Sequence, residues 1–314
     1  MSLRVAIPDL VSPSYFPAIA AVELGLFGSE GLDATLELVF PVTRAYEELR
    51  AGRLDFVAGA AHAPLYAFPD WAGVRLLCAL AQHMYWFLVL RSDLGVKRGD
   101  LRAVQGLRIG AAPGPVDGLR RMLREVGIDP ERDVRIGPIP AAGAGASFGV
   151  AAAKALAAGE IDGFWANGMG AEVAVRNGIG KLVIDARRGD GPSGARHYTF
   201  PALVATERKI AQEPDVVAAA VRAVGSAQRA LVADPERATA VGKKLFPQAE
   251  AELIALLVRR DVPYYDGAIS TEAITALNRF AEDTGILSRS VSYERVVATQ
   301  FEPLWARQSG TYKP

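Results

Sequence analysis

Residues 49–56 read Leu-Arg-Ala-Gly-Arg-Leu-Asp-Phe, and residues 156–163 repeat that pattern as Leu-Ala-Ala-Gly-Glu-Ile-Asp-Gly. Two further pairs of segments keep the same order along the chain. Leu3-Arg-Val-Ala-Ile is echoed by Leu107-Arg-Ile-Gly-Ala, and Gly31-Leu-Asp is echoed by Gly127-Ile-Asp-Pro. Three ordered echoes indicate an internal duplication. We therefore expect two similar lobes, each running strand, helix, turn, strand, helix, turn, strand.

Hydrophobic patterning supports an α/β fold for both lobes. Short β-rich runs alternate with amphipathic helical stretches from residue 3 to about residue 206. The expected strands are residues 3–7, 34–40, 55–60, 74–80, 85–90, 107–111, 134–139, 163–166, 182–185 and 202–206. From residue 207 the pattern is helical only, with expected helices at 214–232, 235–245, 249–260 and 271–284. Gly285 is the expected C-terminal cap of the last helix.

The repeat limits predict a discontinuous domain organisation. Lobe 1 is expected to comprise residues 1–90 and 200–314, including the helical tail, and lobe 2 residues 91–199. Two connecting strands between open α/β lobes would create a cleft that closes by a hinge.

Composition excludes several classes of protein. Half of the 314 residues are apolar and 22% are charged, which suffices for a large core and excludes a disordered chain. The 35 basic residues balance 35 acidic ones, and no basic cluster exceeds Arg187-Arg188 or Lys243-Lys244, so we expect no nucleic-acid surface. A single cysteine excludes an internal disulfide framework. No apolar run reaches the length of about 18 residues that a membrane span requires.

Ligands of open α/β sheets gather beyond the carboxyl ends of the strands. Several loops expected at that edge lead straight into helices, whose N-termini favour an anionic ligand group. Aromatic residues in these loops would suit an apolar ligand body. The loops are residues 8–14, 40–44, 60–63, 112–117, 140–147 and 166–169.

The opening of the chain also carries a family resemblance. Ser12-Pro-Ser-Tyr-Phe-Pro-Ala-Ile-Ala-Ala-Val-Glu-Leu-Gly-Leu-Phe, followed by Glu30-Gly-Leu-Asp and a strand, resembles the nitrate/sulfonate/taurine-type (NMT1/THI5-like) substrate-binding proteins of ABC importers. The repeated segments match the same pattern, and the resemblance covers residues 3–285. It implies a type II periplasmic-binding-protein fold, a small-molecule solute, an ABC permease as partner and a monomeric state.

We expect the ligand to contact residues from both lobes. The expected contacts are Ser12, Tyr15, Arg44, His62, Gly114, Asp117, Trp165, Asn167 and Tyr198. Arg44 could bind a carboxylate or sulfonate in bidentate fashion, or it could be an exposed helix-start residue paired with Glu47 or Glu48. His62 could contact the ligand, be structural or act in catalysis.

An enzyme on the same fold is the alternative: a decarboxylase, a desulfinase or a pyrimidine-precursor synthase, with His62 or Asp117 as the titratable group. Gly145-Ala-Ser147-Phe-Gly149 fits a nucleophile elbow, but it does not directly follow a strand, so we read Ser147 as lying near a helix start. Cys78 lies in an apolar strand and is expected to be a core thiol. We expect no metal and no cofactor.

The location of the protein has two interpretations. Met1 leads directly into a strand pattern, without the charged and apolar segments of a signal peptide. The resemblance implies a periplasmic protein whose signal peptide has been removed. The alternative is a cytoplasmic protein.

Overall fold

The structure is a computed structural model that describes residues 2–139 and 147–306. The chain forms two compact units. Unit 1 comprises Met1–Gln82 and Phe200–Pro314, and unit 2 comprises His83–Thr199. Among the described residues, all ten expected strands are present, with small shifts at their ends.

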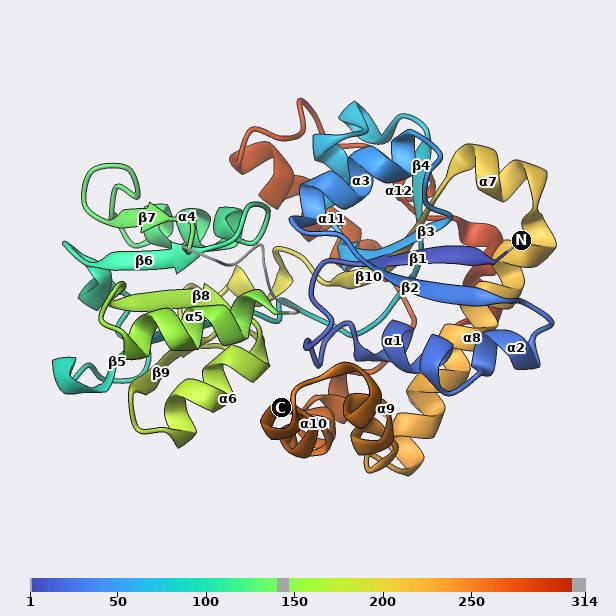
Figure 1. Ribbon diagram of the computed structural model, residues 1–314. Coiled ribbons are helices and arrows are strands. Elements are labelled where there is room, and N and C mark those ends of the chain that lie inside the picture. The colour runs from blue at the N-terminus through green and yellow to red at the C-terminus, as the bar shows by residue number, and fades with distance from the viewer. Residues whose placement is uncertain (1, 140–146, 307–314) are drawn as a thin grey trace. The chain divides into compact units, whose positions relative to one another are not determined.

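Unit 1 is built on a five-stranded sheet with the order β2-β1-β3-β10-β4 (Figure 1). Its strands are β1 (Leu3–Ile7), β2 (Ala34–Leu38), β3 (Phe56–Ala60), β4 (Val74–Ala79) and β10 (Pro201–Thr206). Strands β1, β2 and β3 are parallel, whereas β10 runs antiparallel to both β3 and β4. The carboxyl ends of β1, β2 and β3 therefore share one edge of the sheet.

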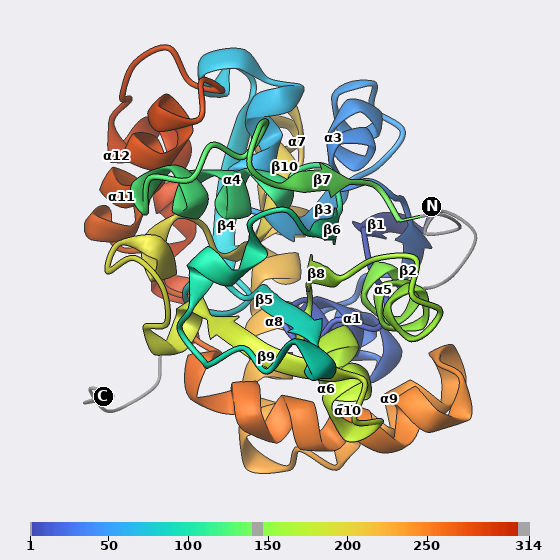
Figure 2. The ribbon, with the colours of Figure 1, turned by 90° about the vertical axis from the view of Figure 1, so that its left-hand side faces the viewer.

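The helices of unit 1 come from both ends of the chain. They are α1 (Phe16–Glu23), α2 (Leu26–Ser29), α3 (Val42–Arg50), α7 (Glu207–Gln212), α8 (Pro214–Ala233), α9 (Arg237–Leu245), α10 (Gln248–Asp261), α11 (Thr271–Asp283) and α12 (Tyr293–Val296), with the short 3₁₀ helices η1 (Ala63–Tyr66), η2 (Pro69–Trp71), η7 (Val262–Tyr264) and η8 (Thr299–Leu304). Helices α9 and α10 pack side by side, and α8 packs along α1 (Figure 2).

The last long helix ends as its sequence predicts. After α11, Gly285 adopts a φ of 78°, a left-handed conformation that glycine adopts without strain. Its N–H donates to the carbonyl of Glu282, and the N–H of Ile286 donates to the carbonyl of Ala281. These two bonds form a Schellman motif, so the expected cap at Gly285 is confirmed.

Unit 2 repeats the architecture of the first sheet, with the strand order β7-β6-β8-β5-β9. Its strands are β5 (Phe87–Arg91), β6 (Arg108–Ala111), β7 (Arg135–Gly137), β8 (Gly163–Ala166) and β9 (Gly180–Asp185). Strands β6, β7 and β8 are parallel, and β5 runs antiparallel to β8 and β9. Its helices are α4 (Val116–Glu125), α5 (Phe148–Ala157) and α6 (Gly168–Arg176), with the 3₁₀ helices η3 (Ser92–Leu94), η4 (Leu101–Val104), η5 (Ala186–Arg188) and η6 (Ala195–His197).

The strand β5 corrects the expected division of the chain. The sequence-based boundary assigned residues up to 90 to the first lobe, but Phe87–Arg91 pairs with β8 and β9 of unit 2. Strand pairing is a long-range choice, and an apolar strand fits the middle of either sheet equally well by its own sequence. In each unit the antiparallel strand occupies the fourth position of the sheet: β10 in unit 1 and β5 in unit 2.

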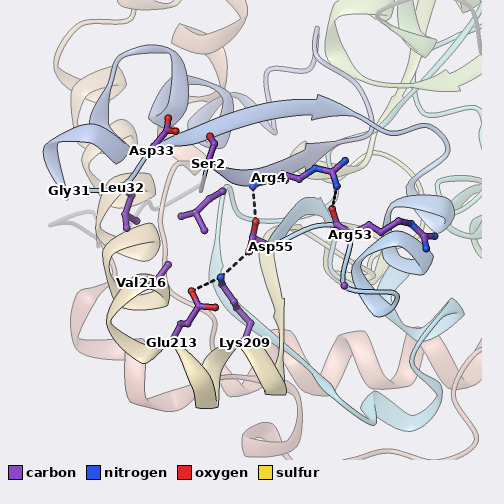
Figure 3. A pocket seen from close by; sticks show the side chains of 12 residues that line it. Ser2, Arg4, Gly31, Leu32, Asp33, Arg53, Asp55, Lys209, Glu213 and Val216 are labelled. Carbon is purple, nitrogen blue, oxygen red and sulfur yellow. Dashed lines mark hydrogen bonds and ion pairs between the residues drawn. The ribbon is translucent and has the colours of Figure 1, made fainter.

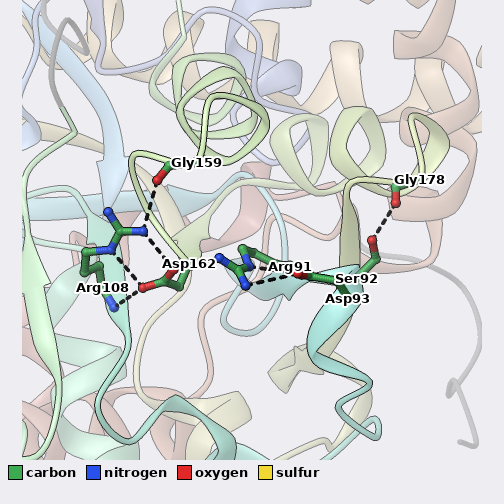
Figure 4. Close-up of polar contacts among 7 residues, drawn as sticks. All are labelled: Arg91, Ser92, Asp93, Arg108, Gly159, Asp162 and Gly178. Carbon is green, nitrogen blue, oxygen red and sulfur yellow. Dashed lines mark hydrogen bonds and ion pairs between the residues drawn. The ribbon is translucent and has the colours of Figure 1, made fainter.

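The duplicated segments place an aspartate at the same point of both sheets. Asp55 immediately precedes β3, and its carboxylate accepts the backbone N–H of Arg4 on β1 at 2.8 Å. Asp162 immediately precedes β8, and its carboxylate accepts the backbone N–H of Arg108 on β6 at 2.9 Å (Figure 4). The Leu-Asp and Ile-Asp pairs of the repeat thus tie the amino ends of neighbouring parallel strands together.

Helix α8 is long and apolar enough, by length and composition, to cross a membrane. However, 56% of its apolar window is buried within the fold. It packs against α1 and α2 of the same unit. A mostly buried apolar helix is typical of the core of a globular unit.

Candidate functional site

In unit 1 the loop after β1 occupies the expected ligand edge and buries its polar side chains. Asp9, Ser12 and Ser14 are all buried. The Asp9 carboxylate accepts the N–H of Val11 at 2.9 Å and so shapes the loop. The Ser12 hydroxyl has no hydrogen-bond partner among the described residues, although a buried hydroxyl without a partner costs free energy. The Ser12 hydroxyl can therefore donate and accept a further hydrogen bond at the carboxyl end of β1.

Residues of the C-terminal part of unit 1 hold the loop after β1 in place. The Tyr265 hydroxyl donates to the carbonyl of Pro13 at 2.6 Å, and the Ser14 hydroxyl donates to the Asp261 carboxylate at 3.4 Å. The buried Asp261 is also paired with Arg260 at 3.1 Å. The C-terminal helices thus position the candidate ligand loop.

Tyr15 and His62 both lie at this edge, and both are buried. Tyr15 directly precedes α1. Burial raises the pKa of Tyr46 well above its usual value, and the nearby Tyr15 contributes to the same shift. His62 follows β3, and its ring meets that of Phe280 from α11 in a T-shaped contact at 5.3 Å. His62 is wholly shielded from solvent, so a structural contribution accompanies any contact with a ligand.

Arg44 lies in the first turn of α3 rather than in a loop. Its side chain is 65% exposed and lies 3.9 Å from the Glu48 carboxylate. Arg44 is therefore an exposed residue at the start of a helix, paired with Glu48 one turn further along. This is the second of the two interpretations that the sequence offered for Arg44. An exposed pair of this kind contributes little to stability.

In unit 2 the loop after β6 and the end of β8 are joined by a hydrogen bond. The Trp165 indole Nε1 donates to the carbonyl of Pro115 at 2.9 Å. Gly114 precedes that proline with a φ of 88°, which favours glycine. Asp117 lies half-buried in the first turn of α4, where the positive end of the helix dipole stabilises a carboxylate. The structure therefore brings Gly114, Asp117 and Trp165 together at one edge.

Asn167 caps the helix that follows β8. Its side-chain Oδ1 accepts the N–H groups of Met169 at 3.0 Å and Gly170 at 3.2 Å. The cap orients the N-terminus of α6 at the carboxyl edge of the sheet, the edge at which α4 and α5 also begin. Since β6 and β8 are parallel, these three helices direct their N-terminal N–H groups to the same edge.

The aromatic residues of this edge belong mostly to the core of unit 2. Tyr85, Trp86 and Trp165 are buried, with ring centroids 4.6 Å apart for Tyr85–Trp86 and 6.4 Å for Trp86–Trp165. Tyr198, just after η6, is also buried. The ring pairs are tilted, at interplanar angles of 45° and 60°, and such contacts stabilise the packing, so these side chains contribute to the core whether or not they contact a ligand.

The expected loop 140–147 lies outside the described residues except for Ser147. Ser147 is the N-cap of α5, and its hydroxyl accepts the N–H of Val150 at 3.3 Å. This confirms the interpretation of Ser147 as a helix-start residue. Its backbone φ of −149° and ψ of 123° are extended, as expected for a helix cap.

A cavity of about 710 Å³ in unit 1 opens at the opposite edge of the sheet, where the parallel strands begin (Figure 3). Its charged groups neutralise one another: Lys209 lies 2.8 Å from Asp55 and 2.7 Å from Glu213, and Arg4 pairs with Glu37. A cavity whose basic groups are already paired offers little to an anionic ligand, although the Ser2 hydroxyl in its lining has no partner among the described residues. The carboxyl edges remain the better candidate site.

The sequence interpretation missed a group of basic residues in unit 2. His83, Arg187 and Arg196 come from three separate segments, and Arg187 is buried at the end of β9. Their sequence signal is a pair of basic dipeptides beside strand ends, Arg187-Arg188 and Arg196-His197. Neither dipeptide stands out as a charge cluster until the fold brings them together.

The single cysteine has the properties of a core thiol. Cys78 lies in β4 opposite Leu203 of β10, and burial raises its pKa to about 12. The thiolate, which is the nucleophile, is therefore suppressed at neutral pH.

We expect Cys78 to resist a thiol-specific reagent such as 5,5′-dithiobis(2-nitrobenzoate) in the native protein at pH 8 and to react fully in guanidinium chloride. The absorbance of the released thionitrobenzoate measures both rates. Equally fast labelling of native and unfolded protein would contradict the burial and would restore a cysteine-dependent enzyme as a candidate.

The two units have equivalent strand orders, and the helical tail belongs to unit 1. This architecture, shared with the SsuA structures described below, is the type II periplasmic-binding-protein fold. The NMT1/THI5-like family model matches residues 12–238. The chain therefore belongs to the NMT1/THI5-like family, as the sequence resemblance implied. A search of curated proteins finds no match.

Solved structures extend the likeness over the whole fold. The alkanesulfonate-binding protein SsuA from Xanthomonas axonopodis pv. citri, bound to MOPS, has a TM-score of 0.71 and 16% identity, over 96% of this chain and 97% of that chain. The periplasmic aliphatic sulphonate binding protein SsuA from Escherichia coli has a TM-score of 0.68 and 12% identity, over 100% and 94%. The desulfurization enzyme DSZB has a TM-score of 0.64 and 16% identity, over 96% and 98%. At sequence identities this low, the likeness shows a common fold and nothing more.

Proposed function

We propose that this protein is the solute-binding component of an ABC importer and that it binds a small anionic organic molecule. The observation that carries the proposal is the edge shared by the starts of α4, α5 and α6, where N–H groups and helix dipoles favour an anion. In unit 1 the hydroxyl of Ser12, which has no partner among the described residues, offers a further hydrogen bond. The family and the SsuA likenesses support the same conclusion.

The remaining expectations belong to this proposal. The ligand contacts are Ser12, Tyr15, Arg44, His62, Gly114, Asp117, Trp165, Asn167 and Tyr198. Unit 1 supplies the first four of these residues, and unit 2 supplies the others. The protein acts as a periplasmic monomer that delivers its solute to a permease and carries out no reaction. The core position of Cys78 argues against cysteine-dependent desulfination despite the likeness to DSZB.

A thermal-shift screen tests the function. The panel comprises taurine, MOPS, benzenesulfonate, benzoate, nitrate and a phosphorylated aminopyrimidine. A ligand at 100 times its Kd adds about 2.7 kcal/mol to the free energy of unfolding, a shift of a few degrees in Tm. A hit that is recovered unchanged by mass spectrometry supports a binding protein. A hit that is recovered as a product identifies an enzyme instead.

We expect Asn167→Asp to weaken binding of an anionic hit on the order of ten-fold or more while Tm changes little. Aspartate caps a helix as well as asparagine, so the substitution adds a negative charge at the candidate site and keeps the cap. Truncation of Tyr15 or His62 would be less informative, because both are buried and their loss would also change stability. Isothermal titration calorimetry measures the affinity.

The matched control is Asn177→Asp at the other end of the same helix. Asn177 is exposed and follows Arg176 at the C-terminus of α6. The control should bind as the wild type does. Equal affinity of both variants for the anion would refute the assignment of this edge.

A further inference from the structure

A group of basic side chains gathers in unit 2 beside the amino end of β5 and the carboxyl end of β9. His83 and Met84 lead into β5, Arg187 lies in η5 directly after β9, and Arg196 lies in η6. In the sheet, Phe87 of β5 faces both Asp185 of β9 and Ala166 of β8. The basic group therefore lies on the same edge of the sheet as Trp165 and the start of α6.

Arg196 is held in place by two contacts with the segment before β5. Its guanidinium Nη2 donates to the ring Nε2 of His83 at 2.7 Å, and its backbone carbonyl accepts the N–H of Met84 at 2.9 Å. A guanidinium can only donate, so Nε2 of His83 must be the unprotonated, accepting nitrogen of a neutral imidazole. Burial first, and then the charges of Arg196, His197 and Arg187, together lower the pKa of His83 to about 3.

The backbone of His83 has an uncommon conformation. Its φ is 67°, a left-handed conformation that is uncommon for a residue with a side chain. The His197 ring meets it edge to face at 5.1 Å. Strained residues persist where the surroundings determine their position, and they concentrate at binding sites.

Arg196 has binding capacity that the described residues do not use. Its Nε is shielded from solvent and has no acceptor, and no carboxylate in residues 2–139 or 147–306 forms an ion pair with it. The nearby acids have other cations: Asp190 pairs with Arg98 at 2.8 Å, and Asp185 lies 3.6 Å from Arg188. Arg196, His197 and Arg187 each oppose a positive charge on His83, so an anion placed here would relieve repulsion among these basic groups.

We propose that Arg196, positioned by the neutral His83, recognises the oxyanion of the ligand, a sulfonate or a carboxylate. The inference rests on the proposed function and assigns its anion-recognising side chain. Guanidinium donors match the paired oxygens of both groups, and the buried Arg187 adds a second positive charge near His83. Tyr85, Trp86 and Trp165 lie on the same edge and would suit an aromatic body.

Titration of matched benzene derivatives tests this inference. The probes are benzenesulfonate and benzoate, with benzenesulfonamide and benzamide as neutral analogues, and calorimetry measures each Kd. We expect one of the anions to bind the wild type and its neutral analogue to bind far more weakly. Which anion binds more tightly distinguishes a sulfonate site from a carboxylate site.

Arg196→Gln should weaken the anion on the order of ten- to a hundred-fold, since hydrogen bonds to charged groups contribute about 1.5–3 kcal/mol. Arg196→Lys keeps the charge and should retain part of the affinity. The matched control is Arg176→Gln, since Arg176 is exposed on α6 of the same unit and pairs with Glu172. His83→Gln keeps an acceptor near the position of Nε2 and should bind better than His83→Leu.

Tm measured without ligand shows whether each variant is folded. Wild-type affinity in a folded Arg196→Gln variant would overturn the inference and leave the proposed function standing. Binding of the neutral analogues as tightly as the anions would also overturn it. If none of the four probes binds the wild type, the inference fails for aromatic oxyanions, and the wider panel decides the proposed function separately.

Discussion

Replacing Gly170 with alanine should destabilise unit 2 by roughly 3 kcal/mol, although alanine is the better helix former by about 1 kcal/mol. Gly170 lies in the first turn of α6, where a Cβ atom would lie 2.6 Å from the carbonyl carbon of Gly149 and 2.7 Å from its Cα. Both atoms are backbone of α5, so no side chain can move aside. The two helices would have to separate.

The same separation should weaken ligand binding. A Cβ atom at Gly149 would lie 2.5 Å from Oδ1 of Asn167, which caps α6. The close approach of the two glycines thus sets the position of the candidate anion-binding helix. Urea denaturation followed by circular dichroism gives the free energy of unfolding, and calorimetry with a panel hit gives the affinity.

Gly137→Ala is the matched control in the same unit. Gly137 ends β7, a Cβ atom added there would meet nothing within 4 Å, and its φ is not in the left-handed region. We expect the control to lie within about 0.5 kcal/mol of the wild type. If Gly170→Ala is as stable as this control, α5 and α6 do not pack at so close a spacing.

Replacing Asp162 with asparagine should cost about 2 kcal/mol at pH 7. The Asp162 carboxylate accepts the backbone N–H, Nε and Nη2 of Arg108, each at 2.9 Å, and Nη1 of Arg91 at 3.4 Å (Figure 4). Arg108 lowers the pKa of Asp162 to about 2 through these hydrogen bonds. Asparagine would lose the charge and would present N–H donors to N–H donors.

The pH dependence follows from the sign of that shift. The pKa of Asp162 is lower in the folded state than the value of about 3.9 in an unfolded chain, so its contribution is complete above about pH 4. It disappears as the pH falls through 2. The stability difference between the wild type and Asp162→Asn should therefore narrow between pH 4 and pH 2, and urea titrations across that range measure it.

Asp93→Asn is the control for this experiment. Asp93 also pairs with Arg91, at 3.0 Å, but its side chain is 68% exposed. An exposed pair contributes about 0–1 kcal/mol, so the control should change stability little at any pH. A stability difference for Asp162→Asn that stays constant from pH 7 to pH 2 would contradict the ionic origin of its effect.

Much of the fold could be predicted from local sequence. Alternating and helical periodicity located the ten strands and the helices of the tail, and Gly285 marked a helix end. The repeat correctly indicated two units of equal strand order. It also contained the two aspartates that link neighbouring strands, Asp55 and Asp162, although only their position in the folded sheets explains why both segments keep that residue.

The candidate site was less predictable. The sequence indicated that Ser147 lies near a helix start, and Ser147 caps α5. Asn167 was expected only as a ligand contact, and the structure shows that it caps α6. It left open whether Arg44 binds a ligand or is exposed beside Glu48, and it could not show that His62 is enclosed against Phe280. The basic group at Arg196 has no compact sequence signal, because its members lie in three separate segments. These segments meet through the pairing of β5 with β9 and through the hydrogen bonds of Arg196 to His83 and Met84.

The sequence alone determined the secondary structure, the duplication and the family, because periodicity, caps and turns depend on residues close together in the chain. The tertiary structure decided which sheet receives β5 and which polar side chains are buried. It also decided where positive charge accumulates. Those properties arise from contacts between segments that are distant in sequence, and each such contact depends on the position of both segments in the fold.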